Sequence, residues 1–303
     1  MNKKIYYRFL TAAAFGISAC HSPAGEANEP APPFNRDSLV SHIIILASDS
    51  FQGRKPFTAG EEKTIAYLQQ QFSSMGLEPG NGRSFLQDVP LVDISRTTDP
   101  VMKVESARGS FPLKDGKDYV LSTESTDPVI SLDKADLVFA GYGVVAPEYH
   151  WNDYAGIYVK GKVVLVMVND PGFGTTDTSI FKGRTMTYYG RWTYKFEEAA
   201  RQGAKGCLII HNTAAASYPF SVVQSSWGSS SLFLDERKNP VYHCPFEGWV
   251  SADAAKKLLA AAGKDSSLLV QANKPGFKAV PLEEKLSTSM RVKAVYNNSK
   301  NVI

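Results

Sequence analysis

Side chains able to carry out catalysis are sparse in this 303-residue chain, and they match no common catalytic pattern. No two of its histidines have the spacing that places zinc ligands on one face of a helix. These histidines are His21, His42, His150, His211 and His243. His150 and Asp153 are close enough in sequence to share a metal ion, but two polar residues in a turn more often form hydrogen bonds at the surface. The sequence therefore predicts no catalytic residue and no complete metal site.

The densest group of aromatic residues lies within residues 186–195. It contains Tyr188, Tyr189, Trp192 and Tyr194, together with Arg191. Aromatic rings beside a cation could line a site for the side chain or the carboxylate of a peptide. The same residues could equally pack against the helix predicted to follow them, because aromatic side chains also dominate ordinary cores. Both interpretations remain open from the sequence.

A Gly-Tyr-Gly sequence at residues 141–143 follows a predicted strand and partly matches a dinucleotide-binding fingerprint. That fingerprint functions only where a helix begins beside the phosphates. Here Pro147 follows closely and no amphipathic helix pattern is present. We therefore predict a strand and a turn rather than a nucleotide site.

Four helices are predicted, at residues 38–47, 61–75, 193–202 and 251–262. The second has apolar residues at three- and four-residue steps and ends at Gly76. Strands are predicted at residues 85–92, 136–140, 163–168 and 206–211, with an Asp-Gly hairpin at residues 113–119. Alternating polarity predicts a half-buried strand at residues 285–294, followed by a turn at residues 297–300 and a new strand from Asn301. The expected class is a mixed α/β protein whose middle part is dominated by β-structure.

The first residues are typical of an export signal. Lys3, Lys4 and Arg8 precede an apolar run at residues 9–17, which is about half the ~20 residues that a membrane-spanning helix needs. Ile17-Ser-Ala-Cys20 resembles a bacterial lipoprotein box, so we predict a signal peptide at residues 1–19, lipidation of Cys20 and a disordered tether at residues 20–35. A plain secretory signal is the alternative. Two acyl chains would hold the protein stably on a membrane.

Without residues 1–19 the chain has 30 basic and 30 acidic residues. A neutral chain has no overall field that attracts phosphates, so nucleic acid is not an expected partner. The cysteines left are Cys207, in an apolar strand pattern that predicts a buried thiol, and Cys244. Export would permit a disulfide between them, but the sequence does not show whether they are close.

Two sets of motifs resemble a known family. Residues 46–54 (Leu-Ala-Ser-Asp to Gly-Arg) and 58–79 (Thr-Ala-Gly-Glu-Glu to Gly-Leu-Glu-Pro) resemble the opening of secreted co-catalytic zinc aminopeptidases, metallopeptidase family twenty-eight. Residues 137–143, 153–165 and 197–206 resemble the protease-associated (PA) domain that is inserted in many of these enzymes.

The resemblance implies an incomplete α/β peptidase domain with an inserted β-rich α+β PA domain. Residues 36–96 would be the first peptidase elements, residues 97–280 the PA domain and residues 281–303 the return strand. In the family, two zinc ions and a carboxylate base hydrolyse a peptide substrate. The family's zinc ligands follow the segment that Asn301 to Ile303 resembles, so we expect the printed chain to bind no zinc and to be inactive by itself. A non-catalytic lipoprotein whose PA-like domain binds peptides or a protein partner is the alternative.

Overall fold

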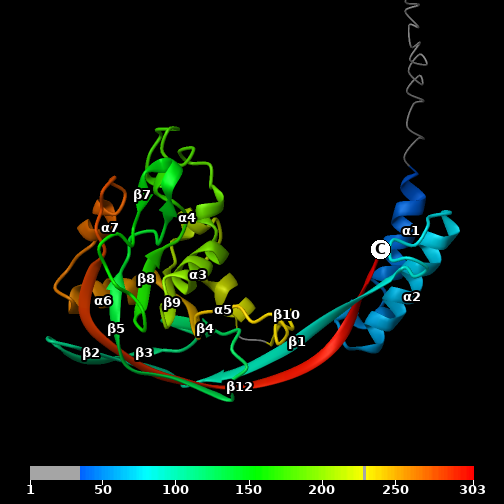
Figure 1. Ribbon diagram of the computed structural model, residues 1–303, viewed down its shortest axis with the longest axis horizontal. Coiled ribbons are helices and arrows are strands. Elements are labelled where there is room, and N and C mark those ends of the chain that lie inside the picture. Colours follow the sequence, from blue (N-terminus) through cyan, green and yellow to red (C-terminus); the bar gives the residue numbers. More distant parts are fainter. Residues whose placement is uncertain (1–34, 228–229) are drawn as a thin grey trace, which may run out of the picture.

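The structure is a computed structural model that describes residues 35–227 and 230–303. The predicted signal peptide, Cys20 and all of the predicted tether except Asn35 lie outside the described residues. The described chain has a mixed α/β fold, in which helices pack against one large mixed sheet (Figure 1). Among the described helices, none has the length and apolar character that a membrane span requires.

The large sheet has the strand order β10-β1-β12-β5-β8-β9-β11-β4, and the hairpin β2–β3 joins it through β12. Its strands are β1 (Leu86–Thr98), β2 (Val101–Ser106), β3 (Gly109–Lys114), β4 (Tyr119–Ser122), β5 (Val129–Phe139), β8 (Val163–Met167), β9 (Gly206–Ile210), β10 (Ser231–Leu234), β11 (Phe246–Val250) and β12 (Val280–Val302). Strands β5, β8, β9 and β11 run parallel to one another. The last three are apolar in nearly every position because both faces of the sheet are covered there. Strands β6 (Val145–Ala146) and β7 (Trp151–Asn152) form a separate pair.

The helices confirm the four predicted from the sequence, with ends shifted by one or two residues. They are α1 (Arg36–Leu46), α2 (Ala59–Ser74), α3 (Trp192–Arg201), α4 (Thr213–Ala216), α5 (Phe220–Trp227), α6 (Ala252–Ala261) and α7 (Ser267–Gln271). Short 3₁₀ helices are η1 (Asp49–Arg54), η2 (Pro147–Tyr149), η3 (Pro171–Gly174) and η4 (Tyr188–Gly190). The side chain of Ser251 caps α6 by accepting a hydrogen bond from the Ala254 N–H, as the sequence predicts.

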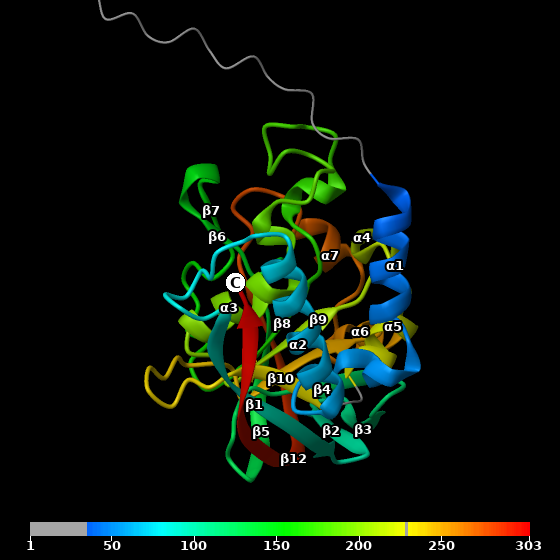
Figure 2. The same cartoon turned by 90° about the vertical axis from the view of Figure 1, so that its right-hand side faces the viewer.

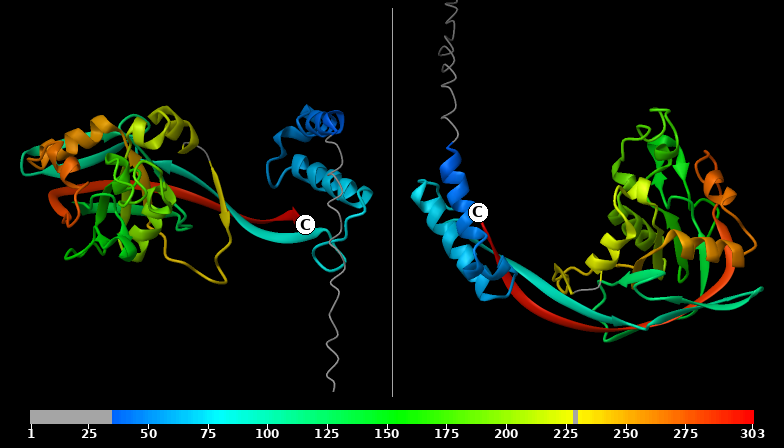
Figure 3. Two further views of the ribbon diagram at one scale, coloured as in Figure 1. Left: turned by 90° about the horizontal axis from the view of Figure 1, so that it is seen from above. Right: turned by 180° about the vertical axis from the view of Figure 1, so that it is seen from behind.

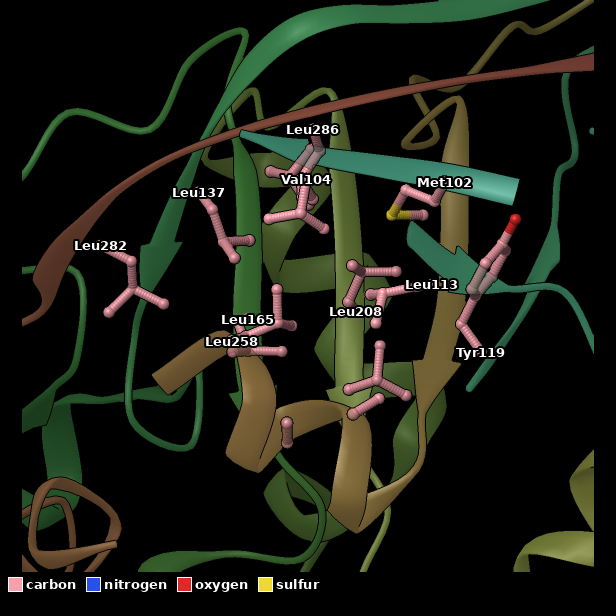
Figure 4. Packing of buried hydrophobic residues seen from close by; sticks show 14 of the residues in the cluster. Met102, Val104, Leu113, Tyr119, Leu137, Leu165, Leu208, Leu258, Leu282 and Leu286 are labelled. Atoms are coloured by element: carbon pink, nitrogen blue, oxygen red, sulfur yellow. The ribbon is translucent and has the colours of Figure 1, made fainter. Parts of the chain in front are cut away.

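Two apolar layers lie on opposite faces of the parallel strands, because alternate residues of each strand point to opposite sides. On one face Leu137, Leu165 and Leu208 pack with Leu258 of α6, and the β2–β3 hairpin adds Leu113 (Figure 4). On the other face Val164, Cys207 and Trp249 pack with Phe196 and Ala199 of α3. Helix α3 thus covers the face opposite α6.

Strand β12 joins the two ends of the molecule. Residues 280–291 pair with β5, and residues 290–302 pair antiparallel with the whole length of β1. Beyond this sheet, β1 and β12 continue as a two-stranded ribbon to the helical pair α1–α2, which lies apart from the other helices (Figures 1 and 3). Figure 2 views the molecule from this end. There Ser299 donates a hydrogen bond to Glu61 of α2, and the Gly80 N–H donates to the Ile303 carbonyl at 3.0 Å.

The turn predicted at residues 297–300 is wrong. Strand β12 continues through it to Val302, so the residues from Asn301 are not a new strand but the end of this one. Asn297 lies opposite Leu91, and Lys300 lies opposite Asp88 and forms an ion pair with it. Pairing with β1 overrides the turn preference of the Asn-Asn-Ser-Lys sequence, because strand formation depends more on neighbours than on local preference.

The hairpin predicted at residues 113–119 is also wrong. A turn does form there, with Gly116 at φ +71°, a conformation that glycine adopts without strain. The Asp118 carboxylate closes it by accepting a hydrogen bond from the Lys114 N–H at 2.9 Å. However, β3 pairs with β2 and β4 pairs with β11, so the turn connects two separate parts of the sheet.

One buried carboxyl on β12 has no hydrogen-bond partner among the described residues. Glu284 is fully buried between Leu282 and Leu286, and neither of its carboxyl oxygens is paired. Burial raises the pKa of Glu284 from its ordinary value of 4.5 to about 8. Between these two pH values the folded chain keeps a proton that the unfolded chain has lost, so folding becomes less favourable as the pH rises.

We therefore expect the free energy of unfolding to fall between pH 5 and pH 8 by as much as about 1.4 kcal/mol per pH unit, and Glu284→Gln to remove that part of the fall. Urea titrations at several pH values measure it. Glu283→Gln, a change at the exposed neighbour, is the matched control and should retain the full slope. Equal slopes for the natural protein and Glu284→Gln would contradict the expectation.

Candidate functional site

The predicted aromatic group is divided between two short elements. Tyr188 and Tyr189 lie on η4, Arg191 precedes α3, and Trp192 and Tyr194 lie in the first turn of α3. Trp192 is 44% exposed and lines a cavity beside α3, whereas Tyr194 is buried. The structure therefore does not bring the five residues together around one cavity.

The hydroxyl groups of Tyr188 and Tyr189 form hydrogen bonds with neighbouring residues. Tyr188 donates to the Glu197 carboxylate at 2.8 Å, and Tyr189 donates to Glu148 at 2.6 Å. Both pKa values are raised, chiefly because each hydroxyl donates to a carboxylate, and that of Tyr189 reaches about 12. These two tyrosines hold in place the short segment that leads into α3.

Tyr194 connects α3 to β6. Its hydroxyl accepts a hydrogen bond from the Val145 N–H and donates one to the Val145 carbonyl, both at 3.1 Å. Its ring contacts Tyr189 edge-on, with ring centroids 5.0 Å apart. This residue holds two elements together and does not line the cavity.

A buried lysine lies behind the aromatic segment. Lys195 is fully buried and donates a hydrogen bond to the Tyr189 carbonyl at 2.7 Å. Burial lowers its pKa to about 7, although the charges of Asp153 and Asp170 act in the opposite direction. Asp153 accepts hydrogen bonds from the N–H groups of Tyr142 and Val144, both at 3.0 Å. Behind the aromatic segment the interior thus contains a buried lysine close to two carboxyl groups.

His150 and Asp153 do not form a metal pair in the structure, and Asp153 forms hydrogen bonds instead, as the sequence favours for two polar residues in a turn. The Asp153 carboxylate also accepts a hydrogen bond from the Trp151 indole N–H at 2.8 Å, and His150 is exposed on a left-handed turn. The strand and turn predicted at residues 141–143 are confirmed, because the short strand β6 follows rather than a helix.

The two cysteines are free in the structure, and both are buried. Burial raises the pKa of both the Cys207 and the Cys244 thiol. A thiol that rarely ionises is a poor nucleophile and a poor metal ligand. Neither cysteine therefore belongs to a reactive site.

A cavity with a volume of about 550 Å³ lies between α3 and the end of the sheet formed by β11 and β4. Trp192 and Phe196 of α3 and Tyr242 form its apolar walls. A neighbouring cavity of about 360 Å³ shares Tyr242 and His243 with it. Such a mixture of aromatic walls and a few polar groups is typical of ligand sites.

Three residues with metal-ligand side chains meet in this cavity. Ligand atoms of Glu124, His243 and Glu247 all lie within 4.8 Å of one another. The two strands explain the meeting: Glu247, the second residue of β11, lies opposite Ser122 of β4, and Glu124 lies two residues beyond Ser122. Since side chains alternate along strands, both carboxylates point to the face covered by α3.

We call these three residues the Glu–His–Glu cluster. Burial is the main cause of the pKa shifts of its two carboxyl groups. Burial raises the pKa of Glu247 well above its ordinary range, and the nearby Glu124 charge raises it further. Burial also raises the pKa of Glu124, while His243 lowers it. His243 places its Nδ1 3.7 Å from Glu124 and its Nε2 3.0 Å from Glu236. The cluster can accept a positively charged ligand atom.

Sequence reasoning missed this cluster. Glu124 lies more than one hundred residues before His243 and Glu247 along the chain, and only the pairing of β4 with β11 brings it near Glu247. One signal was present: Glu247 stands between Phe246 and Trp249 in an otherwise apolar segment. A charged residue inside a buried strand is unusual enough to be singled out.

Comparison with known proteins found no match that bears on function. The chain matches no protein-family model and no curated protein. The assignment of function therefore depends on the residues themselves.

We expect Tyr194→Phe to lower the free energy of unfolding by about 1–2 kcal/mol, because both hydrogen-bonding groups of the Val145 backbone lose their partner. Arg191→Ala should change it by less than about 0.5 kcal/mol, since Arg191 is exposed. Urea denaturation followed by circular dichroism measures both. A larger loss of unfolding free energy for Arg191→Ala than for Tyr194→Phe would contradict the structural role assigned to Tyr194.

Proposed function

We propose that this chain supplies the N-terminal elements and the substrate-side, PA-like domain of an exported zinc aminopeptidase-like peptidase. The observation that carries the proposal is the pairing of β12 with all 13 residues of β1. Residues 99–279 leave and re-enter the molecule through these two neighbouring strands. Closely spaced ends are what the insertion of one domain into another requires.

A second observation supports the same proposal. Helix α1 has no buried residue, and five of its six apolar side chains are 39–65% exposed. They are Leu39, Val40, Ile43, Ile44 and Ile45. An apolar surface on a helix is typical of a contact with another part of a protein. The proposal assigns this surface to contact with the catalytic part of the peptidase.

The two zinc ions that the family resemblance implies do not fit the described residues. A co-catalytic pair needs a ligand set for each ion, and the described part of the chain gathers one group of three ligand-type side chains. We therefore derive no hydrolytic step from this chain. The role proposed for its own residues is binding: the cavity beside α3 would receive an apolar side chain of the peptide against Trp192 and Phe196.

A second candidate function is a non-catalytic lipoprotein that binds peptides. The same cavity favours it, because apolar walls next to Glu124 and Glu247 suit a peptide with a free amino terminus. The two candidates differ in turnover and not in binding, so one set of assays separates them.

The protein expressed from its whole gene is expected to release N-terminal residues from peptides and to lose this activity with a zinc chelator. Trp192→Ala should raise KM several-fold and leave kcat within about twofold, because it removes binding contacts and no reacting group. Arg191→Ala is the matched control and should change neither constant. Peptide binding without any turnover in the zinc-loaded protein would reject the peptidase and favour the binding lipoprotein.

The proposal also places the protein outside the cytoplasm, held on a membrane by acyl chains on Cys20. In a bacterial host, Cys20→Ser is expected to move the protein from the membrane fraction to the soluble fraction and to abolish labelling by radioactive palmitate. Cys207→Ser, a change at a buried cysteine, should leave both unchanged. Membrane attachment that survives Cys20→Ser would contradict lipidation at this position.

A further inference from the structure

We propose that Glu124, His243 and Glu247 bind one divalent zinc ion in the cavity beside α3. This site is separate from the hydrolytic zinc pair of the proposed function and does not depend on it. One imidazole nitrogen and two carboxylates are a common set of three protein ligands for zinc, and they leave a fourth position open. The open position would face the cavity, where Trp192 and Phe196 form the opposite wall.

The backbone brings the three ligands together from separate elements. Glu247 lies at the start of β11, Glu124 lies just past the end of β4, and the antiparallel pairing of these strands fixes their separation. His243 lies in the loop that leads into β11. The ligand atoms lie within 4.8 Å of one another, and ligand atoms around one tetrahedral zinc ion are about 3.3 Å apart. Side-chain rotation can close this difference, since Glu124 and His243 are only partly buried.

Glu247 is the independent sign that a ligand belongs here. Its side chain is 6% exposed, lines the cavity and has no hydrogen-bond partner among the described residues. A buried carboxylate without a partner is costly, and a second carboxylate beside it increases the cost. A bound cation would offset both effects, because it pairs with the two negative charges at once.

His243 is oriented as a metal-binding histidine usually is. Its Nδ1 faces Glu124 at 3.7 Å, while its Nε2 donates to the Glu236 carboxylate at 3.0 Å. A ligating histidine commonly donates its other ring N–H to a carboxylate, which fixes the ring and makes the ligating nitrogen more basic. Glu236 is therefore a positioning residue for the site.

The test is direct zinc binding by the full chain, measured by equilibrium dialysis with metal analysis and by isothermal titration calorimetry. We expect one equivalent of zinc to remain on the natural protein. His243→Ala and Glu247→Gln should weaken its binding at least ~100-fold, and Glu236→Gln by ~10–100-fold. Circular dichroism spectra and unfolding midpoints establish that each variant is folded.

Two variants are matched controls. Glu197→Gln changes another acidic residue of the same cavity, and His150→Ala changes an exposed histidine elsewhere, so both should bind zinc as the natural protein does. The proposal is overturned if the natural protein retains no zinc. It is equally overturned if folded His243→Ala and Glu247→Gln bind zinc as tightly as the controls. Because binding and not hydrolysis is measured, either result leaves the proposed peptidase role to its own assay.

Discussion

The pairing of β12 is the interaction on which the rest of the structure depends. One edge of this strand completes the sheet through β5, and the other edge holds β1 and the β2–β3 hairpin. A two-stranded ribbon is only marginally stable in water by itself. Here its two ends are secured differently: the sheet holds one, and the contact of Ser299 with Glu61 and the α2 helix holds the other. Slipping the register by one residue would turn Leu286 and Met290 out of the core, so the alternating pattern also fixes the register.

Polar groups determine how the face covered by α3 is built. Lys195 and Asp153 lie inside the protein, where each is surrounded by hydrogen-bonding partners or opposite charge. Glu247 lies at the edge of the same face and has no such partner among the described residues. The first pair orders the aromatic segment before α3, while the Glu–His–Glu cluster lines the cavity, where a ligand can reach it.

Much of the fold could be predicted because its signals are local. Glu61 and Glu62 lie in the first turn of a helix with one apolar stripe, Ser251 caps another helix, and the apolar run at β9 predicts a buried strand. The failures come from pairing partners that local sequence does not contain. The Asn-Asn-Ser-Lys segment favours a turn by itself but is extended opposite β1, and the Asp115-Gly116 turn connects strands that pair elsewhere. The Glu–His–Glu cluster could not be found for the same reason, since His243 and Glu124 become neighbours only in the folded sheet.

The ribbon of β1 and β12 has a mechanical consequence. Because the chain enters and leaves residues 99–279 through adjacent strands, a pull on the α1–α2 pair acts on this region along one shared path. The ladder bonds are perpendicular to the strands, and β1 connects the helical pair to the sheet without a break, so tension along the ribbon is carried by the backbone and not by the ladder bonds. Bending or twisting, in contrast, requires none of these bonds to break. The connection is therefore stiffer against stretching than against bending or twisting.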